Sequence, residues 1–327
     1  MVGHATTRRR AVYLDVSEPV PGDGPGRLRA AGFDVRIELA RTDAEVVAAA
    51  SGAEVILLGD TPVTAAALAG MPGLRGIALG TAGVDQIDVA AAGARGVWVS
   101  NVPAASTEEV AVHALAMALA LVRNLPFFDR HVRGGGWDYT SAGELRRPST
   151  LRFGVVGLGR IGRRVAGLAR PLFARVIGCD PAVAAGAQPP GVELADLDGL
   201  LAGADVVSLH LPLTAASEGI IDAGRLGRMP RRGYLVNCSR GGLVQTADLL
   251  AALDSGHLAG AALDVLPDEP PASDSPLLRH PRTLVTPHVG FLSRESTLDC
   301  TTRQVDNVLA WAQRGRPLDV VVEGVGA

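Results

Sequence analysis

Gly157-Leu158-Gly159-Arg160-Ile161-Gly162 matches the pattern Gly-x-Gly-x-x-Gly. The hexapeptide follows an apolar run at residues 153–156 and precedes a helical pattern at residues 163–172. In a turn between a strand and a helix, the first glycine permits a tight bend, the second lets the backbone approach a pyrophosphate, and the third allows close helix packing. The N-terminus of that helix attracts the anion. We therefore predict a dinucleotide-binding turn built from Gly157, Gly159, Arg160, Ile161 and Gly162.

Asp180 lies at the spacing that a ribose-binding acid has after a dinucleotide-binding turn. Asp180 follows the next predicted strand, residues 175–179, and lies 18 residues beyond Gly162. A carboxylate at this spacing accepts hydrogen bonds from ribose hydroxyls and repels a 2′-phosphate. The expected cofactor is therefore NAD rather than NADP.

Short β-rich runs alternate with segments of helical length along the whole chain. The first series ends at Asn101-Val102-Pro103 and lies at residues 11–16, 33–39, 54–58, 76–79 and 97–100. The second series lies at residues 151–156, 175–179, 205–210, 233–237, 261–264 and 283–286. This alternation is typical of helices covering a parallel sheet. It predicts an α/β fold with two doubly wound parallel-sheet domains.

The segment between the two series combines a helix and a loop. Ser106 fits an N-cap and Glu109 completes a capping box, which predicts a helix that is apolar on almost every side as far as Val122. Such a helix must be buried between layers or between subunits. Residues 130–149 are rich in Gly, Arg and Pro, and we predict a loop there.

Composition excludes several classes of function. All 31 basic residues are Arg, so neither a Schiff-base lysine nor a Walker-type phosphate loop is expected. These residues are scattered among 34 acidic ones, so a basic surface that binds nucleic acid is not expected. The longest apolar run, residues 110–122, falls short of the roughly 20 residues that span a bilayer. The 3 cysteines show no Cys-x-x-Cys spacing, which suits a reducing compartment. We expect a cytoplasmic protein without membrane contact and predict no metal site.

Three polar residues follow predicted strands of the second series. They are Arg240 in Asn-Cys-Ser-Arg-Gly-Gly, Glu269 in Asp-Glu-Pro, and His288 in Thr-Pro-His-Val-Gly. Ligands bind outside the carboxyl ends of the strands in an open parallel sheet. We therefore expect these three side chains to meet at one edge of the second sheet.

These segments resemble the D-isomer-specific 2-hydroxyacid dehydrogenase family. The resemblance covers nearly the whole chain and includes the glycine turn and the motifs at residues 80–88, 101–103 and 209–214. It implies D-stereospecific hydride transfer between NAD(H) and a small 2-hydroxy acid or 2-oxo acid.

The chemistry of that reaction suits the three polar residues. A fixed guanidinium can bind the substrate carboxylate and polarise the carbonyl, which assigns Arg240. Hydride transfer leaves negative charge on the substrate oxygen, so an imidazole is needed as a proton donor in reduction and as a base in oxidation, which assigns His288. A carboxylate at Glu269 would fix the tautomer of the imidazole and favour its charged form.

The resemblance also implies contacts with substrate and cofactor. The backbone amides of Ala82 and Gly83 would receive the substrate carboxylate, and Thr107, Cys238 and Asp264 would line the nicotinamide end. Further cofactor contacts are expected at His210, Pro212, Ser239 and Gly290. The remaining histidines, including His113, lack such partners, and we interpret them as structural or solvated.

The family's domain arrangement is discontinuous. It implies a Rossmann NAD-binding domain at residues 104–290, inserted into a flavodoxin-like substrate domain at residues 1–103 and 291–327. The active site would lie in the interdomain cleft. The apolar helix after Ser106, in the NAD-binding domain, would make a twofold homodimer.

Departures from the family pattern narrow the substrate. Phosphoglycerate-type members usually carry an Arg before the substrate glycine loop, whereas Leu79 and Gly80 stand here, so a phosphorylated substrate is not expected. Bulky Phe291 and Leu292 favour a compact or apolar substrate side chain. Formate-type or phosphite-type oxidation is an alternative within the family, although formate-type members usually lack this Glu. A further alternative is a NAD-sensing module, like the transcriptional corepressors that share the fold.

Overall fold

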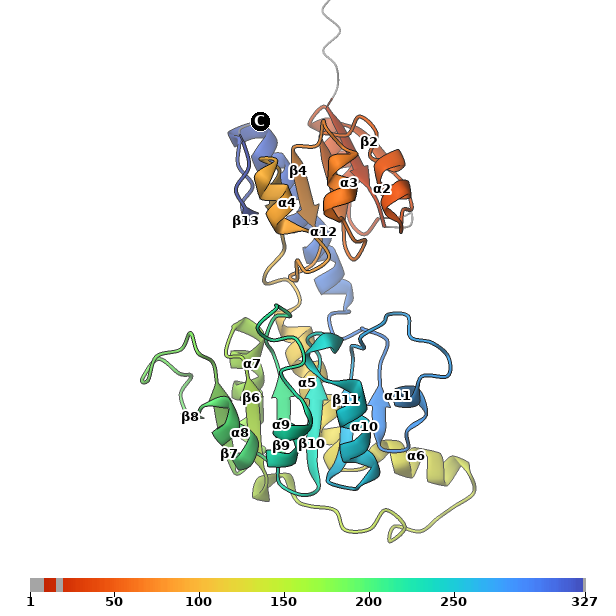
Figure 1. The fold of residues 1–327 in the computed structure, drawn as a ribbon, viewed down its shortest axis with the longest axis vertical. Coiled ribbons are helices and arrows are strands. Elements are labelled where there is room, and N and C mark those ends of the chain that lie inside the picture. The colour runs from red at the N-terminus through yellow and green to blue at the C-terminus, as the bar shows by residue number, and fades with distance from the viewer. Residues whose placement is uncertain (1–8, 16–19, 326–327) are drawn as a thin grey trace, which may run out of the picture. The chain divides into compact units, whose positions relative to one another are not determined.

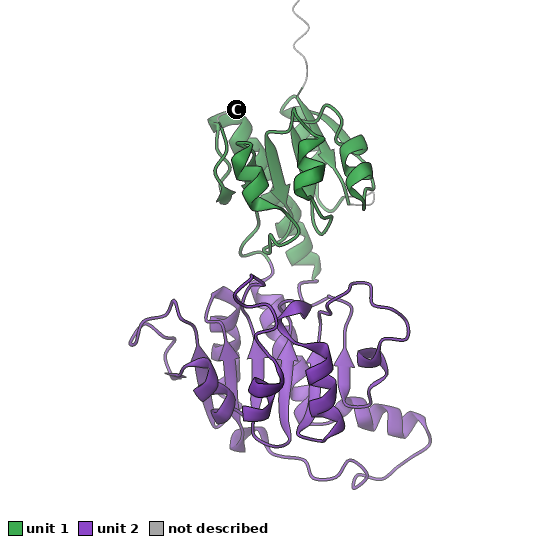
Figure 2. Cartoon of the chain, viewed as in Figure 1, with its two compact units in different colours: residues 1–105, 293–327 green, residues 106–292 purple. Residues whose placement is uncertain are grey.

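The computed structural model describes residues 9–15 and 20–325, and the chain forms two compact units (Figure 2). Unit 1 contains residues 1–105 and 293–327, and unit 2 contains residues 106–292. Unit 1 is therefore discontinuous in sequence, with unit 2 inserted into it. The sequence prediction placed the two boundaries after residues 103 and 290.

Unit 1 is built on a six-stranded sheet in the order β13-β5-β4-β3-β1-β2 (Figure 1). The strands are β1 Arg10–Tyr13, β2 Asp34–Ile37, β3 Val55–Leu58, β4 Gly76–Leu79, β5 Trp98–Ser100 and β13 Val320–Val322. All neighbours pair in parallel except β13, which is antiparallel to β5. Apart from β13, the order is that of a flavodoxin-like sheet, with its switch point between β1 and β3.

Helices cover both faces of the unit 1 sheet. The helices are α1 Gly24–Ala30, α2 Asp43–Ala49, α3 Ala65–Ala69, α4 Val89–Ala94 and α12 Arg294–Arg314. Buried residues of α2, α3 and α4 pack on one face, and those of α1 and α12 pack on the other. Strands such as β3, Val-Ile-Leu-Leu, are therefore buried on both faces, which explains why they are continuous apolar runs without alternation.

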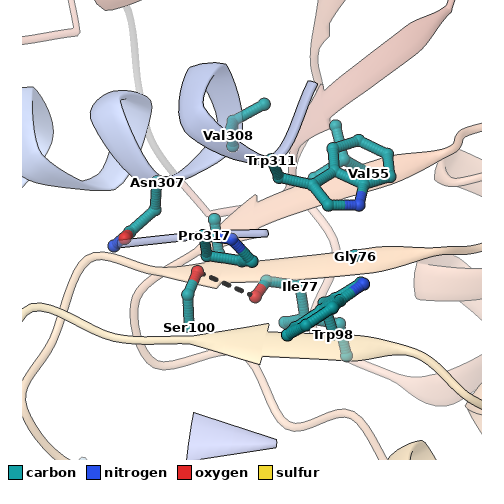
Figure 3. Close-up of a pocket in the computed structure, with 10 residues that line it drawn as sticks. Val55, Gly76, Ile77, Trp98, Ser100, Asn307, Val308, Trp311 and Pro317 are labelled. Atoms are coloured by element: carbon teal, nitrogen blue, oxygen red, sulfur yellow. Dashed lines mark hydrogen bonds between the residues drawn. The ribbon is translucent and has the colours of Figure 1, made fainter. Parts of the chain in front are cut away.

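A small hollow of about 10 Å³ lies between α12 and the sheet of unit 1 (Figure 3). Asn307, Val308 and Trp311 of α12 border it from one side, and strand residues including Ile77 and Trp98 border it from the other. A volume of this size is close to the space that one water molecule needs. The hollow is therefore a packing detail and too small for a small-molecule ligand.

Unit 2 is built on a seven-stranded parallel sheet in the order β12-β11-β10-β9-β6-β7-β8. The strands are β6 Arg152–Val156, β7 Arg175–Cys179, β8 Val192–Leu194, β9 Val206–Leu209, β10 Gly233–Asn237, β11 Leu258–Leu263 and β12 Thr283–Val285. Counted from β6, this is the dinucleotide-binding order 3-2-1-4-5-6 with one added strand. The order reverses between β6 and β9, and the glycine turn follows β6.

The unit 2 sheet is also covered on both faces (Figure 1). Helices α5 Thr107–Val122 and α7 Arg160–Ala169 pack on one face. The other face carries α8 Leu197–Gly203, α9 Ala223–Arg228, α10 Thr246–Asp254 and α11 Pro276–Arg279. The prediction of two parallel-sheet α/β domains is confirmed.

Several local predictions were incomplete or wrong. Strands β8 and β13, of 3 residues each, were not predicted. The predicted loop at residues 130–149 begins inside helix α6, Leu125–Arg133. Ser106 does stand at the N-cap of α5, but its side chain makes no capping hydrogen bond. Its backbone angles of −117° and 21° lie outside the extended region that an N-cap normally adopts, so the predicted capping box does not form.

Within residues 9–15 and 20–325, no single helix has both the length and the apolar composition that crossing a membrane requires. The pair α5 and α6 meets both requirements jointly but is bent by 62° between the two helices.

Gln304 provides a stability test for unit 1. Its buried side-chain amide on α12 donates to the carbonyl oxygens of Leu58 and Ala78 at 3.1 and 2.8 Å, at the ends of β3 and β4. Gln304→Met keeps the volume and leaves both buried carbonyls without this donor. We expect the free energy of unfolding to fall by about 1–3 kcal/mol.

The measurement is urea unfolding followed by the fluorescence of Trp98 and Trp311, both in unit 1. The exposed Gln313 on the same helix provides the matched control, Gln313→Met, with an expected change within about 0.5 kcal/mol. Equal stability of the two variants would contradict the proposed link between α12 and the strand ends.

Candidate active site

The glycine turn of unit 2 has the geometry of a phosphate cradle. Gly157 has φ +92°, and a Cβ on it would lie 2.3 Å from the carbonyl oxygen of His210. A Cβ on Gly162 would lie 1.9 Å from the carbonyl oxygen of Gly157. A Cβ on Gly159, at the start of α7, would meet nothing within 4 Å. Two glycines therefore allow close packing of the backbone, while the third leaves open space at a helix N-terminus, as a pyrophosphate requires.

Asp180 lies beside this turn, at the end of β7. Its Oδ2 accepts from the backbone N–H of Leu158 at 2.8 Å, and its Oδ1 accepts from that of Ala182 at 2.9 Å. The carboxylate is thus held next to the open space at Gly159 by two backbone donors. Glycine turn and acid together fit a dinucleotide with a free ribose 2′-hydroxyl.

His210 borders the turn from β9. Its Nε2 is 2.7 Å from the Ser208 hydroxyl, while its Nδ1 is buried and has no hydrogen-bond partner in the part of the chain that the structure describes. Burial lowers the pKa of His210 to about 4, so the ring is neutral at physiological pH. A neutral ring adds no charge beside the phosphate cradle.

Arg240 lies in a turn that directly follows β10. The buried Asn237 side chain shapes this turn, because its Nδ2 donates to the Arg240 carbonyl oxygen at 2.8 Å and its Oδ1 accepts from the N–H of Ser239 at 3.0 Å. A Cβ on Gly241 would lie 2.0 Å from the carbonyl carbon of Leu266. The turn after β10 therefore packs directly on the loop that carries Glu269.

Glu269 and His288 form a close polar contact at this edge of the sheet. Oε2 of Glu269 lies 2.6 Å from Nδ1 of His288, and Oε1 accepts from the backbone N–H of Leu266 at 2.8 Å. About a third of each side chain is exposed to solvent, 35% for Glu269 and 37% for His288. The Glu269 carboxylate is thus oriented by the backbone of Leu266 and contacts the Nδ1 side of the imidazole.

The electrostatic surroundings keep Glu269 ionised. Burial raises the pKa of this carboxyl, but the hydrogen bonds from His288 and Leu266, with the charges of His288 and Arg240, outweigh burial. The net effect is a pKa below the ordinary value. Glu269 is therefore a carboxylate throughout the neutral pH range, beside an imidazole and a guanidinium.

Asp264 holds the turn that carries His288. Its carboxylate, 2% exposed, accepts from the N–H groups of Val289 at 3.0 Å and Gly290 at 2.8 Å, and its backbone oxygen accepts from the N–H of His288 at 2.8 Å. His288 itself has φ 52°, a left-handed conformation that costs energy in a residue other than glycine. The three hydrogen bonds offset that cost and fix the direction of the imidazole.

Two further side chains complete the surroundings of Asp264. The Thr286 hydroxyl donates to Asp264 Oδ1 at 2.6 Å, and His113 Nε2 of α5 lies 3.4 Å from the same oxygen. Asp264 was predicted to line the nicotinamide end, and His113 was interpreted as structural or solvated. In the structure the Asp264 carboxylate accepts from protein donors, and its predicted place at the nicotinamide end stays a prediction. The available signal was an acid directly after a buried strand, β11.

The other predicted cofactor residues lie near the same edge. Thr107 is the first residue of α5, and Ser239 Oγ donates to the Leu209 carbonyl oxygen at 2.8 Å, joining the ends of β10 and β9. Cys238 Sγ lies 3.7 Å from Met117 Sδ, and burial raises the pKa of its thiol, which therefore stays protonated. The Pro212 carbonyl oxygen accepts from the Ser217 hydroxyl at 2.7 Å.

Ala82 and Gly83 belong to unit 1, in the loop after β4. Ala82 is exposed and Gly83 is partly buried. Their predicted meeting with the unit 2 residues involves both units and stays a prediction.

Comparison with known proteins gives consistent matches. Residues 115–290 match the family model described as D-isomer specific 2-hydroxyacid dehydrogenase, NAD binding domain. D-3-phosphoglycerate dehydrogenase of Archaeoglobus fulgidus is 36% identical over 288 residues, which cover 87% of this chain and 54% of that protein. Glycerate dehydrogenase of Methylorubrum extorquens is 35% identical over 294 residues, covering 86% and 89%. The chain spans about half the length of the phosphoglycerate dehydrogenases that it matches.

Solved structures share the fold along the whole chain. The crystal structure of TT0316 protein from Thermus thermophilus is 33% identical, with a TM-score of 0.86, and the match covers 96% of this chain and 100% of that one. A pyruvate reductase of Chlamydomonas reinhardtii is 29% identical, with a TM-score of 0.79, covering 95% and 98%.

The support of the His288 turn by Asp264 can be tested by Asp264→Asn. Both carboxylate oxygens act as acceptors, and an amide nitrogen cannot accept the N–H group that one of them holds. We expect the free energy of unfolding to fall by about 1–3 kcal/mol in urea. The exposed Asp274 of the same unit supplies the control, Asp274→Asn. If Asp264→Asn were as stable as the control, the hydrogen bonds described would not hold the turn.

Proposed function

The chain belongs to the D-isomer-specific 2-hydroxyacid dehydrogenase family, and we propose that it transfers hydride between NAD(H) and a small, unphosphorylated 2-hydroxy acid or 2-oxo acid with D-stereospecificity. The observation that carries the proposal is the 2.6 Å contact between Glu269 Oε2 and His288 Nδ1. The turn of Arg240 packs directly beside the Glu269 loop at the same sheet edge. A cation, an imidazole and an orienting carboxylate are the groups that this reaction needs.

NAD is the cofactor of the family, and the glycine turn fits it. In this assignment Gly159 at the start of α7 receives the pyrophosphate, and Gly157 and Gly162 allow the close packing of the turn. Arg160 and Ile161 supply the first turn of α7, and Asp180 binds the ribose. When bound, the reduced cofactor supplies a hydride and the oxidised cofactor accepts one.

Arg240 binds the substrate in this mechanism. Its guanidinium donates hydrogen bonds to the carboxylate and to the 2-oxo oxygen, which orients the substrate and draws electron density away from the reacting carbon. Arg240 lies close enough to Glu269 that its positive charge contributes to the lowered pKa of the Glu269 carboxyl.

His288 moves the proton. Its Nδ1 is held by Glu269, so Nε2 gives a proton to the substrate oxygen in reduction and takes it back in oxidation. The Glu269 carboxylate stabilises the charged imidazolium and fixes the ring orientation. Thus the loop after β12 supplies the proton donor, and the loop after β11 supplies its orientation and its charge state.

The residues before the glycine loop and after the His288 turn favour a compact substrate. Leu79 is fully buried and offers no cation for a phosphate. Phe291, 41% exposed, meets the His288 ring edge-on with ring centres 6.3 Å apart. A bulky apolar ring next to the acid–base residue favours a short or apolar substrate side chain.

The proposal is tested by NADH absorbance on incubation of the full chain with a panel of 2-oxo acids. The panel contains glyoxylate, hydroxypyruvate, phosphohydroxypyruvate, and aliphatic and aromatic 2-oxo acids. We expect oxidation of NADH by at least one unphosphorylated member and a weaker response to the phosphorylated one. Tight NADH binding without turnover on any member would favour the NAD-sensing module instead.

Cofactor preference follows from Asp180. Its carboxylate repels a 2′-phosphate, so Asp180→Ala should lower the ratio of kcat/KM for NADH over NADPH by about tenfold or more. Asp196→Ala provides a control at a nearby acid that caps α8. An unchanged ratio in Asp180→Ala would remove Asp180 from the ribose site.

The pH dependence follows from Glu269. The carboxylate stabilises protonated His288, the form that reduction requires, and its lowered pKa keeps it charged at neutral pH. In Glu269→Gln that stabilisation is lost, so His288 releases its proton at lower pH. The alkaline limb of kcat/KM for reduction should move down by about one pH unit. The exposed Glu144→Gln is the control, and coincident profiles would contradict the role of Glu269.

A twofold homodimer through unit 2 is supported by exposed apolar side chains on α5, on α6 and after it. They are Val112, Leu125, Val132, Trp137 and Tyr139, with exposed fractions from 45% to 90%. Side chains of this kind are expected at a subunit contact. We expect sedimentation equilibrium to give the mass of two chains, and Trp137→Ser with Val112→Arg to shift it toward one. A monomeric wild-type chain at micromolar concentration would exclude this dimer.

A further inference from the structure

The loop after β4 carries backbone donors that face no protein acceptor. Within the described ranges, the N–H groups of Ala82 and Gly83 have no hydrogen-bond partner in the protein. Their carbonyl groups are both held, because Asn101 Nδ2 donates to the Ala82 oxygen at 2.7 Å and the Thr81 hydroxyl donates to the Gly83 oxygen at 2.9 Å. The C=O and N–H groups of one peptide share a plane, so the held Ala82 oxygen fixes the N–H of Gly83. The Thr81 oxygen accepts from the N–H of Val102 at 2.9 Å, which fixes the N–H of Ala82. The hydrogen bond from the Thr81 side chain to the Gly83 oxygen closes the loop around these two N–H groups.

Gln86 completes this arrangement from the other end of the loop. Its side-chain Nε2 donates to Thr81 Oγ1 at 3.1 Å and to the Gly59 carbonyl oxygen at 2.6 Å. Gly59 begins the turn after β3. The loop of Ala82 and Gly83 is thus tied to a second loop, at the neighbouring strand end.

The turn that begins at Gly59 is itself fixed by a carboxylate. Asp15, after β1, accepts from the N–H groups of Gly59, Asp60 and Thr61 at 2.8 to 2.9 Å. Consecutive backbone donors around one anion make a stable cradle. Gln86 therefore connects the loop of Ala82 and Gly83 to a rigid point at the switch point of the unit 1 sheet.

The direction of the hydrogen bonds requires an amide at Gln86. The Thr81 hydroxyl has one proton and gives it to the Gly83 oxygen, so its own oxygen needs a donor. The two protons of the Gln86 amide serve Thr81 and Gly59 together. A carboxylate or thioether of the same size could supply neither bond.

We propose that Gln86 is a positioning residue, which presets the N–H groups of Ala82 and Gly83 to receive the carboxylate of the substrate. This inference rests on the proposed function for the identity of the anion. Gln86 acts through Thr81 and does not touch the substrate. The carboxylate is held equally in the ground state and the transition state, so loss of Gln86 should raise KM and leave kcat almost unchanged.

The experiment compares Gln86→Met with Gln313→Met, the same change at an exposed helix position of unit 1. With NADH and glyoxylate we expect KM to rise about tenfold in Gln86→Met, with kcat within about twofold of wild type. Gln313→Met should match wild type. A KM for Gln86→Met equal to that of the control, or a fall in kcat without a change in KM, would overturn the proposal.

A second pair of variants tests the proposal even if Gln86→Met does not fold. Thr81→Val removes the hydroxyl that receives the Gln86 amide, whereas Thr81→Ser retains it. Thr81→Val should reproduce the rise in KM, and Thr81→Ser should restore the wild-type value within about threefold. Equal KM values in Thr81→Val and Thr81→Ser would contradict the proposal that Gln86 acts through the Thr81 hydroxyl.

Binding of oxalate separates this inference from the proposed function. If the wild-type chain reduced none of the 2-oxo acids, the proposed function would fail, and calorimetric titration of oxalate into the chain with NADH would still measure the anion site. About tenfold weaker oxalate binding in Gln86→Met than in Gln313→Met would then support the role of Gln86. Equal binding, or none in wild type, would overturn it.

Discussion

The hydrogen bonds between Asp264 and the backbone of residues 288–290 are the constraint on which the candidate site depends. A buried carboxylate must find donors, and here two of them are consecutive N–H groups after His288. Satisfying Asp264 therefore forces a left-handed conformation on His288 and turns its ring toward Glu269. Without this requirement, β12 could continue in an extended conformation and the imidazole would point elsewhere.

The sheet of unit 2 brings the remaining groups to the same edge. Because its strands are parallel, the segments after β6, β10, β11 and β12 all emerge at the carboxyl ends. The cofactor turn occupies the switch point beside β9, and Arg240, Glu269 and His288 occupy consecutive strand ends. Close backbone packing of Gly241 on Leu266 excludes a side chain between the two loops. Topology thus supplies the proximity, and local hydrogen bonds supply the orientation.

Much of this arrangement could be predicted from the sequence, because its signals are local. The glycine turn, Asp180 and the apolar strands each depend on residues close together along the chain. The structure has the glycines between β6 and α7 and Asp180 directly after β7. The roles of Asp264 and Gln86 were not predicted, because each depends on partners that folding brings close, such as Gly59 for Gln86. Strands β8 and β13 were not predicted, and helix α6 was missed in part because it precedes a loop rich in Gly and Arg.

The central claim is that His288 Nε2 delivers the proton that accompanies hydride transfer. The most direct measurement is chemical rescue of His288→Ala by added imidazole, followed as single-turnover oxidation of NADH with glyoxylate. Rates should fall by about 10²-fold or more in the variant and rise with the concentration of protonated imidazole, while NADH affinity stays at the wild-type value. A variant that keeps wild-type rates, or an inactive variant whose only defect is lost NADH binding, would contradict the assignment of His288.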